Sequence, residues 1–116
     1  MDNLLSVTFE AHNDERNHHR RYEVRLGRDL FGAWTVALSY GRAGRGGQVV
    51  RHSAADSEQV RKVIRESLRR RLSAPRRIGC SYRIKELSVA DGVDVGFWLP
   101  ESELATFREV LGKPLI

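Results

Sequence analysis

The chain has 116 residues, of which 41% are hydrophobic and 30% are charged, a composition typical of one folded domain rather than of a disordered segment. Its single cysteine excludes an intramolecular disulfide and favours a reducing compartment. The N-terminal residues do not resemble a signal peptide, and no stretch reaches the roughly 20 apolar residues of a membrane span. The sequence therefore predicts a single cytoplasmic domain over residues 1–116.

Positive charge is concentrated in one part of the chain. Between Gly41 and Arg77, eleven Arg or Lys residues stand against three acidic residues, a local charge of +8, whereas the rest of the chain carries −3. Most of the basic residues are arginine, whose planar guanidinium pairs well with phosphate oxygens. This asymmetry favours a polyanion such as nucleic acid as the partner; the alternative is a basic face that is only solvated.

Four segments in the first half of the chain have the pattern of β-strands. Leu4–Ala11 is apolar and β-branched, and the polar residues His12–Arg20 after it predict a loop. Apolar and polar residues alternate in Arg21–Gly27 and again in Ala33–Tyr40, and Gln48–His52 can form a fourth strand. Because the connections are short, we expect an antiparallel meander. The apolar residues that share one face are Tyr22, Val24, Leu26, Trp34, Val36, Leu38 and Tyr40.

The period of the sequence changes to that of an α-helix within Ser53–Leu72. Apolar residues there fall at i, i+3, i+4, i+8 and i+12, which makes one stripe along a helix. Asp56 or Ser57 is the expected N-cap, and Pro75 is expected to stop the helix. We expect this helix to cover one face of the sheet. The residues of the stripe are Val60, Val63, Ile64, Leu68 and Leu72.

The C-terminal part of the chain is predicted to add strands and a short helix. One strand is expected within Ile78–Val89 and another within Asp91–Pro100, with Asp91-Gly92 as its turn, followed by a helix over Pro100–Gly112. Trp98 either packs this extension onto the domain or is a hydrophobic anchor for a partner protein. The expected class is α+β: a twisted antiparallel sheet with an amphipathic helix on one face, plus a C-terminal strand and short helix.

The segment RYEVRLGRDLFGAWTVALSYGRAGRGGQV, followed by an Arg-rich helix, resembles the WGR domain over residues 20–82. Residues 83–116 would then be an extension. Tyr22, the LFGAW segment and the pattern WGR-x-G-x-x-G support the resemblance, with Tyr40 in the place of the name-giving tryptophan. The adjacent Gly-Tyr pair of the family appears here as Gly79 and Tyr82. The family occurs in poly(ADP-ribose) polymerases and as small stand-alone bacterial proteins.

The resemblance implies a non-catalytic nucleic-acid-binding module. In the polymerases the tryptophan and arginine of the motif contact the end of a DNA strand. By that resemblance Tyr40 would stack on a sugar or base and Arg42 would contact a phosphate. From the residues alone, Tyr40 could instead be a half-buried core residue, and Arg42 could pair with an acid inside the fold. Arg45 is expected at the exposed tip of the turn, in contact with a phosphate or with solvent.

A cationic band on the exposed side of the predicted helix would extend this nucleic-acid footprint. The alternative for these residues is solvation alone. The rival function is a protein-interaction module, in which the basic face meets an acidic surface and the segment around Trp98 docks on a partner. The residues of the band are Arg61, Lys62, Arg65, Arg69 and Arg70, with Arg76 and Arg77 beyond the helix.

The sequence predicts neither an enzyme nor a metal site. The chain has no recognisable nucleophile–base motif, and the glycine-rich turn lacks the Lys-Ser/Thr pair of a phosphate-binding loop. The histidines and the cysteine do not have the spacing of metal ligands. We therefore expect no cofactor, and DNA, or alternatively RNA, as the partner. The residues weighed as metal ligands are His12, His18, His19, His52 and Cys80.

Overall fold

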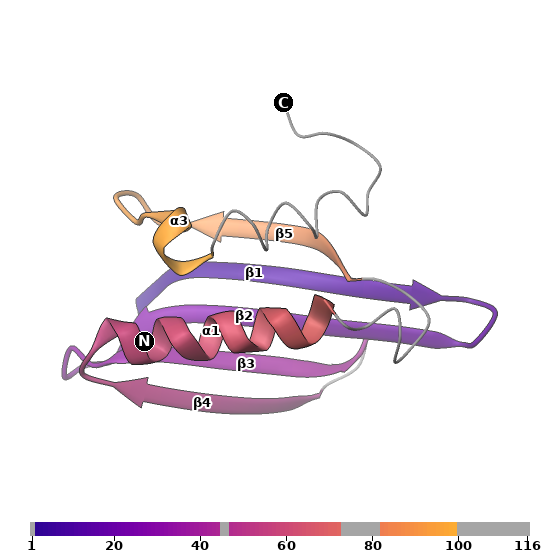
Figure 1. Ribbon diagram of the computed structural model, residues 1–116, viewed down its shortest axis with the longest axis horizontal. Coiled ribbons are helices and arrows are strands. Elements are labelled where there is room, and N and C mark those ends of the chain that lie inside the picture. The colour runs from indigo at the N-terminus through magenta and orange to yellow at the C-terminus, as the bar shows by residue number, and fades with distance from the viewer. Residues whose placement is uncertain (1, 45–46, 73–81, 100–116) are drawn as a thin grey trace.

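An antiparallel sheet and one long helix make up the fold (Figure 1), as seen in a computed structural model that describes residues 2–44, 47–72 and 82–99. Its sheet has five strands in the order β4-β3-β2-β1-β5, and each neighbouring pair is antiparallel. The predicted α+β class is confirmed. The elements are β1 (Asp2–Asn13), β2 (His18–Arg28), β3 (Trp34–Arg42), β4 (Gln48–Ala54), α1 (Ser57–Leu72), β5 (Arg83–Val89) and α3 (Val95–Trp98).

The first hairpin is longer than the sequence predicts. The expected loop His12–Arg20 is wrong, because His12 still pairs with His19 and the turn itself is confined to residues 14–17. Asn17 adopts a left-handed backbone conformation (φ 53°), which asparagine tolerates better than most residues. The backbone pairing continues through polar residues here because a ladder is formed by main-chain groups, whatever the side chains are.

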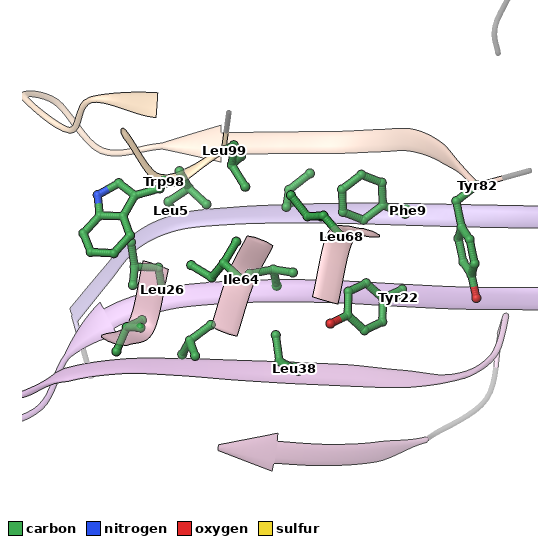
Figure 2. Close-up of a cluster of buried hydrophobic side chains, with 14 of the residues drawn as sticks. Leu5, Phe9, Tyr22, Leu26, Leu38, Ile64, Leu68, Tyr82, Trp98 and Leu99 are labelled. Carbon is green, nitrogen blue, oxygen red and sulfur yellow. The ribbon is translucent and has the colours of Figure 1, made fainter. Parts of the chain in front are cut away.

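The core lies between α1 and the sheet face that the alternation predicted. Figure 2 shows the apolar side chains of the sheet meeting those of the helix, with Ile64 and Leu68 of α1 over the middle of the sheet and Trp98 and Tyr82 at the two ends. Val60, Ile64 and Leu68 are buried, and Val63 and Leu72 pack partly buried against the same core. The predicted helical stripe is therefore confirmed, as is the covering of one sheet face by the helix.

The start of α1 is fixed by a side-chain cap. The Glu58 amide donates a hydrogen bond of 2.9 Å to Asp56 Oδ1, so Asp56, one of the two expected residues, caps the helix. The helix extends to Leu72, and Pro75, its expected stop, lies outside the described residues. Neither helix in the described part of the chain has the length and hydropathy needed to span a bilayer.

The C-terminal extension begins as predicted and then differs. The expected strand within Ile78–Val89 is confirmed as β5, which pairs with β1. The strand expected within Asp91–Pro100 is wrong: after the Asp91-Gly92 turn the chain forms the short helix α3. Asp94 is the reason, because its Oδ1 accepts a hydrogen bond of 3.0 Å from the Gly96 amide and so caps a helical turn. The predicted helix over Pro100–Gly112 lies outside the described residues.

Trp98 packs into the core. Its side chain is 5% exposed, and its ring centroid lies 4.9 Å from that of Trp34. Arg61 fixes the segment further, since its Nε donates a hydrogen bond of 2.6 Å to the Phe97 carbonyl and its guanidinium lies 4.6 Å from the centroid of the Phe97 ring. Of the two alternatives for Trp98, packing onto the domain is confirmed, and an exposed anchor for a partner is wrong.

Candidate nucleic-acid interface

Tyr40 lies near the end of β3, on the sheet face that α1 covers. Its ring stacks against Tyr22 with centroids 6.5 Å apart, and Tyr22 itself is 1% exposed. The Arg71 guanidinium lies 3.8 Å from the centroid of the Tyr22 ring and 5.9 Å from that of Tyr40, so one cation faces two aromatic rings. Tyr40 is half-buried, which agrees with the core interpretation for one side of its ring.

The other side of Tyr40 lines a groove of about 390 Å³ between α1 and the strands β3 and β4. Two polar atoms on the α1 wall, Ser67 Oγ and Arg71 Nε, are buried and have no hydrogen-bond partner among the described residues. Apolar, aromatic and basic groups therefore meet in one cavity, which can hold an apolar or planar group together with an anion. We call this cavity the Tyr40 groove; its lining residues are Tyr22, Leu38, Tyr40, Val50, His52, Val63, Glu66, Ser67, Arg70 and Arg71.

The Tyr22 hydroxyl is a titratable group at the base of this groove. Burial, partly opposed by the nearby charge of Arg71, raises the pKa of Tyr22 from 10.0 to about 12. The neutral phenol is therefore favoured in the folded protein more than in the unfolded chain. Between pH 10 and pH 12 the unfolded chain loses this proton while the folded protein keeps it, so stability falls as the pH rises.

We expect the unfolding free energy to decrease by about 2–3 kcal/mol from pH 9 to pH 12 on account of Tyr22. Urea unfolding across this range, followed by circular dichroism, measures the slope. Tyr22→Phe keeps the buried ring and removes the titration, so its stability should decline less steeply above pH 10. Equal slopes for the two proteins would contradict this assignment.

Arg42 lies on the same face as Tyr40 and contacts the turn of the first hairpin. Its Nη2 donates a hydrogen bond of 3.0 Å to Asn17 Oδ1, and its Nη1 donates one of 3.2 Å to the Asn17 carbonyl. Both acceptors are neutral, so these bonds orient the guanidinium without neutralising it. The alternative for Arg42 was a pairing with an acid inside the fold. The hydrogen bonds of its guanidinium go to Asn17 instead.

Two glycines shape the turn that follows Arg42. Gly44 has φ +82°, a conformation that favours glycine. A Cβ on Gly47 would collide with the Tyr40 carbonyl group and come within 2.7 Å of its carbon. Gly47 is therefore required by the close approach of the two backbone segments beside Tyr40. Arg45, predicted at the tip of this turn, lies outside the described residues.

Two arginines near Tyr40 were missed by the sequence prediction of the site. Arg20 pairs directly with Arg42 across β2 and β3, and it is exposed. Like charges at opposing positions are unfavourable, so this pair would gain from a bound anion. Alternation could have identified Arg20, which precedes Tyr22 by two residues. Arg71 could have been found from its place on the inward stripe of α1, three residues after Leu68.

Four of the five helical residues of the predicted cationic band lie together: a second hollow, of about 420 Å³, is lined by Arg61, Lys62, Arg65 and Arg69 with Glu58, Gln59 and Glu66. Arg61 is committed to Phe97 and α3, and Arg65 has a buried Nε without a partner among the described residues. Lys62 and Arg69 are exposed on the outer side of α1. Arg70 alone of the five lines the Tyr40 groove. The band is thus divided between two hollows, and Arg76 and Arg77 lie outside the described residues.

The opposite face of the sheet carries ion pairs. Glu23 is 8% exposed and accepts hydrogen bonds from Arg21 at 3.0 Å and Thr8 at 3.2 Å, while Arg25 lies 2.8 Å away. A hydrogen bond from His12, opposed by desolvation and aided by Lys85, lowers the pKa of Glu10 below its usual 4.5. Arg21, Arg25 and Lys85 on this face are therefore each paired with a carboxylate.

A histidine pair lies on this second face. His12 Nδ1 and His19 Nδ1 are 2.8 Å apart, and His12 Nε2 lies 2.9 Å from Glu10 Oε1. Within the described ranges no three potential metal ligands converge. The proximity of these two residues follows from the long first hairpin, which the sequence prediction placed in a loop.

Comparison with known families agrees with this geometry. The WGR domain family matches residues 5–73, more than half of the chain, whereas no curated protein sequence matches it. The match starts earlier than the resemblance over residues 20–82, because β1 is part of the same sheet and core. WGR domains serve as nucleic-acid-binding modules in poly(ADP-ribose) polymerases. With its meander, covering helix and Tyr40-Gly41-Arg42 turn, the chain belongs to the WGR domain family.

Proposed function

We propose that this protein is a non-catalytic nucleic-acid-binding module that contacts the DNA backbone or DNA ends. The observation that carries the proposal is the convergence of an aromatic ring and several cations at one end of the helix-covered face. The Arg71 guanidinium lies 5.9 Å from the centroid of the Tyr40 ring, and Arg42 pairs with Arg20 on the neighbouring strand. The convergence draws on β2, β3 and α1, which supports a built surface rather than a local run of charge.

Each group has a definite chemical role in this proposal. The half-buried ring of Tyr40 offers its open side to a base or sugar for stacking. Arg42, oriented by Asn17, meets a phosphate with its charge intact. Arg70 adds a second cation at the groove. Lys62 and Arg69, exposed on the outer side of α1, contribute to the attraction of a polyanion at longer range.

Binding without catalysis is also part of the proposal. Ser67 is the hydroxyl nucleophile that lines the Tyr40 groove, and its Oγ makes no hydrogen bond to a base among the described residues. An activated serine requires such a base within hydrogen-bonding distance. The groove chemistry therefore supports recognition of a ligand more than its conversion.

Fluorescence anisotropy with labelled DNA tests the function. We expect binding to a short duplex at 50 mM salt, with affinity falling about 10–100-fold by 200 mM, because each neutralised phosphate releases counterions. Blunt, nicked and single-stranded DNA of equal length, and a matched RNA duplex, identify the preferred form. A preference for ends appears as tighter binding to nicked or blunt DNA than to a closed circle of the same sequence.

A flat salt response, or no binding at 50 mM salt, would contradict nucleic-acid binding. The rival function is a protein-interaction module whose basic surface meets an acidic protein. Trp98, which that hypothesis offered as the hydrophobic anchor, is buried in the core. Tyr40→Phe and Tyr40→Ala separate stacking from hydrogen bonding. If the ring stacks on DNA, the phenylalanine variant keeps affinity and the alanine variant loses it.

A further inference from the structure

The turn between β2 and β3 presents two large apolar side chains to solvent. Leu30 is 98% exposed and Phe31 is 94% exposed. A single exposed apolar residue is ordinary on a protein surface, but two adjacent ones at the tip of a hairpin form a protruding apolar contact. We call these two side chains the Leu30–Phe31 tip.

The turn that carries the tip is held by its own hydrogen bonds. Asp29 Oδ1 accepts from the amides of Phe31 and Ala33, each at 2.9 Å. The Gly32 amide donates to the Asp29 carbonyl at 3.0 Å, and the Asp29 amide donates to the Ala33 carbonyl at 3.0 Å. Gly32 has φ +80°, where a side chain would be strained. The tip is therefore presented in one conformation, which lowers the entropic cost of binding through it.

Acidic residues gather at the same end of the molecule. The pairing of Arg28 with Trp34, and of Trp34 with Ala54, places the tip beside the start of α1, and α3 lies at this end as well (Figure 1). The carboxylates here outnumber the nearby arginines Arg28 and Arg61, so an anionic membrane or a nucleic acid is disfavoured as the partner of the tip. These carboxylates are Asp29, Asp56, Glu58, Asp91 and Asp94.

The surface that complements the tip lies at the other end of the folded molecule. The Tyr40 groove has apolar walls that include Leu38, Val50 and Val63. Its two arginines, Arg70 and Arg71, outnumber its one carboxylate, Glu66. Val50 is 37% exposed there. The volume of the Tyr40 groove, about 390 Å³, lies in the range of pockets that enclose small ligands. The groove therefore has room for side chains from a protruding turn.

We propose that the Leu30–Phe31 tip of one molecule docks in the Tyr40 groove of a second copy. The tip and the groove differ in shape and in the sign of their surrounding charge, so the contact is head-to-tail rather than two-fold symmetric. A head-to-tail contact leaves one tip and one groove unused and continues into rings or open chains. Because charge complementarity contributes, the assembly weakens as salt rises.

Complementation between two variants tests this arrangement. Phe31→Ser removes the tip, and Val50→Glu places a carboxylate in the groove; both positions are exposed enough that the fold should be kept. Sedimentation velocity over a concentration series at 50 mM salt is expected to show growing assemblies for the natural protein and monomers for each variant alone. An equimolar mixture of the two variants is expected to form a dimer, through the intact tip of one and the intact groove of the other.

Val49→Glu is the matched control for the groove. Val49 neighbours Val50, is 51% exposed, and pairs with Ser39 on the opposite sheet face, so this variant should assemble like the natural protein. A monomeric natural protein at all concentrations, assembly of Val50→Glu alone, or a monomeric mixture would each overturn the proposal. The tip and a nucleic acid would use the same groove, so they compete, and Phe31→Ser should bind DNA at least as well as the natural protein. DNA binding by this variant is read separately, so a failure of the proposed function is distinguishable from a failure of this one.

Discussion

Replacement of Trp98 by alanine is expected to lower the unfolding free energy by about 3–5 kcal/mol, the range for a large aromatic residue lost from a core. Trp98 is 5% exposed, and its ring meets Trp34 and Phe97 with centroids 4.9 Å apart in each case. The cavity would open between the sheet and α3, and the short helix α3 would lose the side chain that attaches it to the core. Urea unfolding followed by circular dichroism measures the change.

Phe31→Ala is the control for this prediction. Phe31 is also aromatic but is 94% exposed, so its removal should change the unfolding free energy by less than about 0.5 kcal/mol. The contrast separates burial from residue type. A loss below about 1 kcal/mol for Trp98→Ala would mean that the extension after β5 contributes little to the core, against the packing seen in Figure 2.

The regular part of this fold could be predicted from the sequence because burial is periodic. Alternation identifies the core faces of β2 and β3, since Tyr22, Val24 and Val36 all point toward α1. The helical stripe and the Asp56 cap identify α1 in the same way. In these elements the local pattern and the tertiary packing require the same residues.

The two structural errors arise where local pattern and tertiary packing diverge. The polar residues from His12 to Arg20 have no apolar face, yet backbone pairing alone extends the first hairpin through them. The apolar residues around Val95 have the pattern of a strand. The Asp94 cap instead starts the short helix α3, in which Trp98 packs into the core. Neither outcome is encoded in the hydrophobic period.

The location of Tyr40 could be predicted from the sequence. The Tyr40-Gly41-Arg42 turn was identified by its motif, and Tyr40 is half-buried, as alternation indicates. What the sequence could not show is the relation between α1 and the sheet. Only that packing places Arg71 over Tyr22 and moves Arg61 away to α3. The helical spacing of the arginines alone could not show that Arg71 faces the sheet while Arg61 contacts α3.

The second large effect is expected from removing charge on the helix-covered face. The double variant Arg20→Gln/Arg70→Gln should bind duplex DNA about 10–100-fold more weakly at 100 mM salt, with a salt slope shallower by about two phosphate contacts. Arg20 contributes through its position opposite Arg42, and Arg70 through the Tyr40 groove. Both are exposed, so the fold should be preserved. Anisotropy titrations at several salt concentrations measure both quantities.

Arg25→Gln/Arg51→Gln is the charge-matched control on the opposite face. Arg25 and Arg51 both pair with Ala37 across neighbouring strands, and Arg21 remains to pair with Glu23. The two double variants carry the same net charge, so a difference between them reports location. If DNA binds through the face that carries Tyr40, the control loses less than about threefold in affinity. Equal losses would show that net charge alone drives binding, and a greater loss in the control would place the nucleic acid on the other side of the sheet.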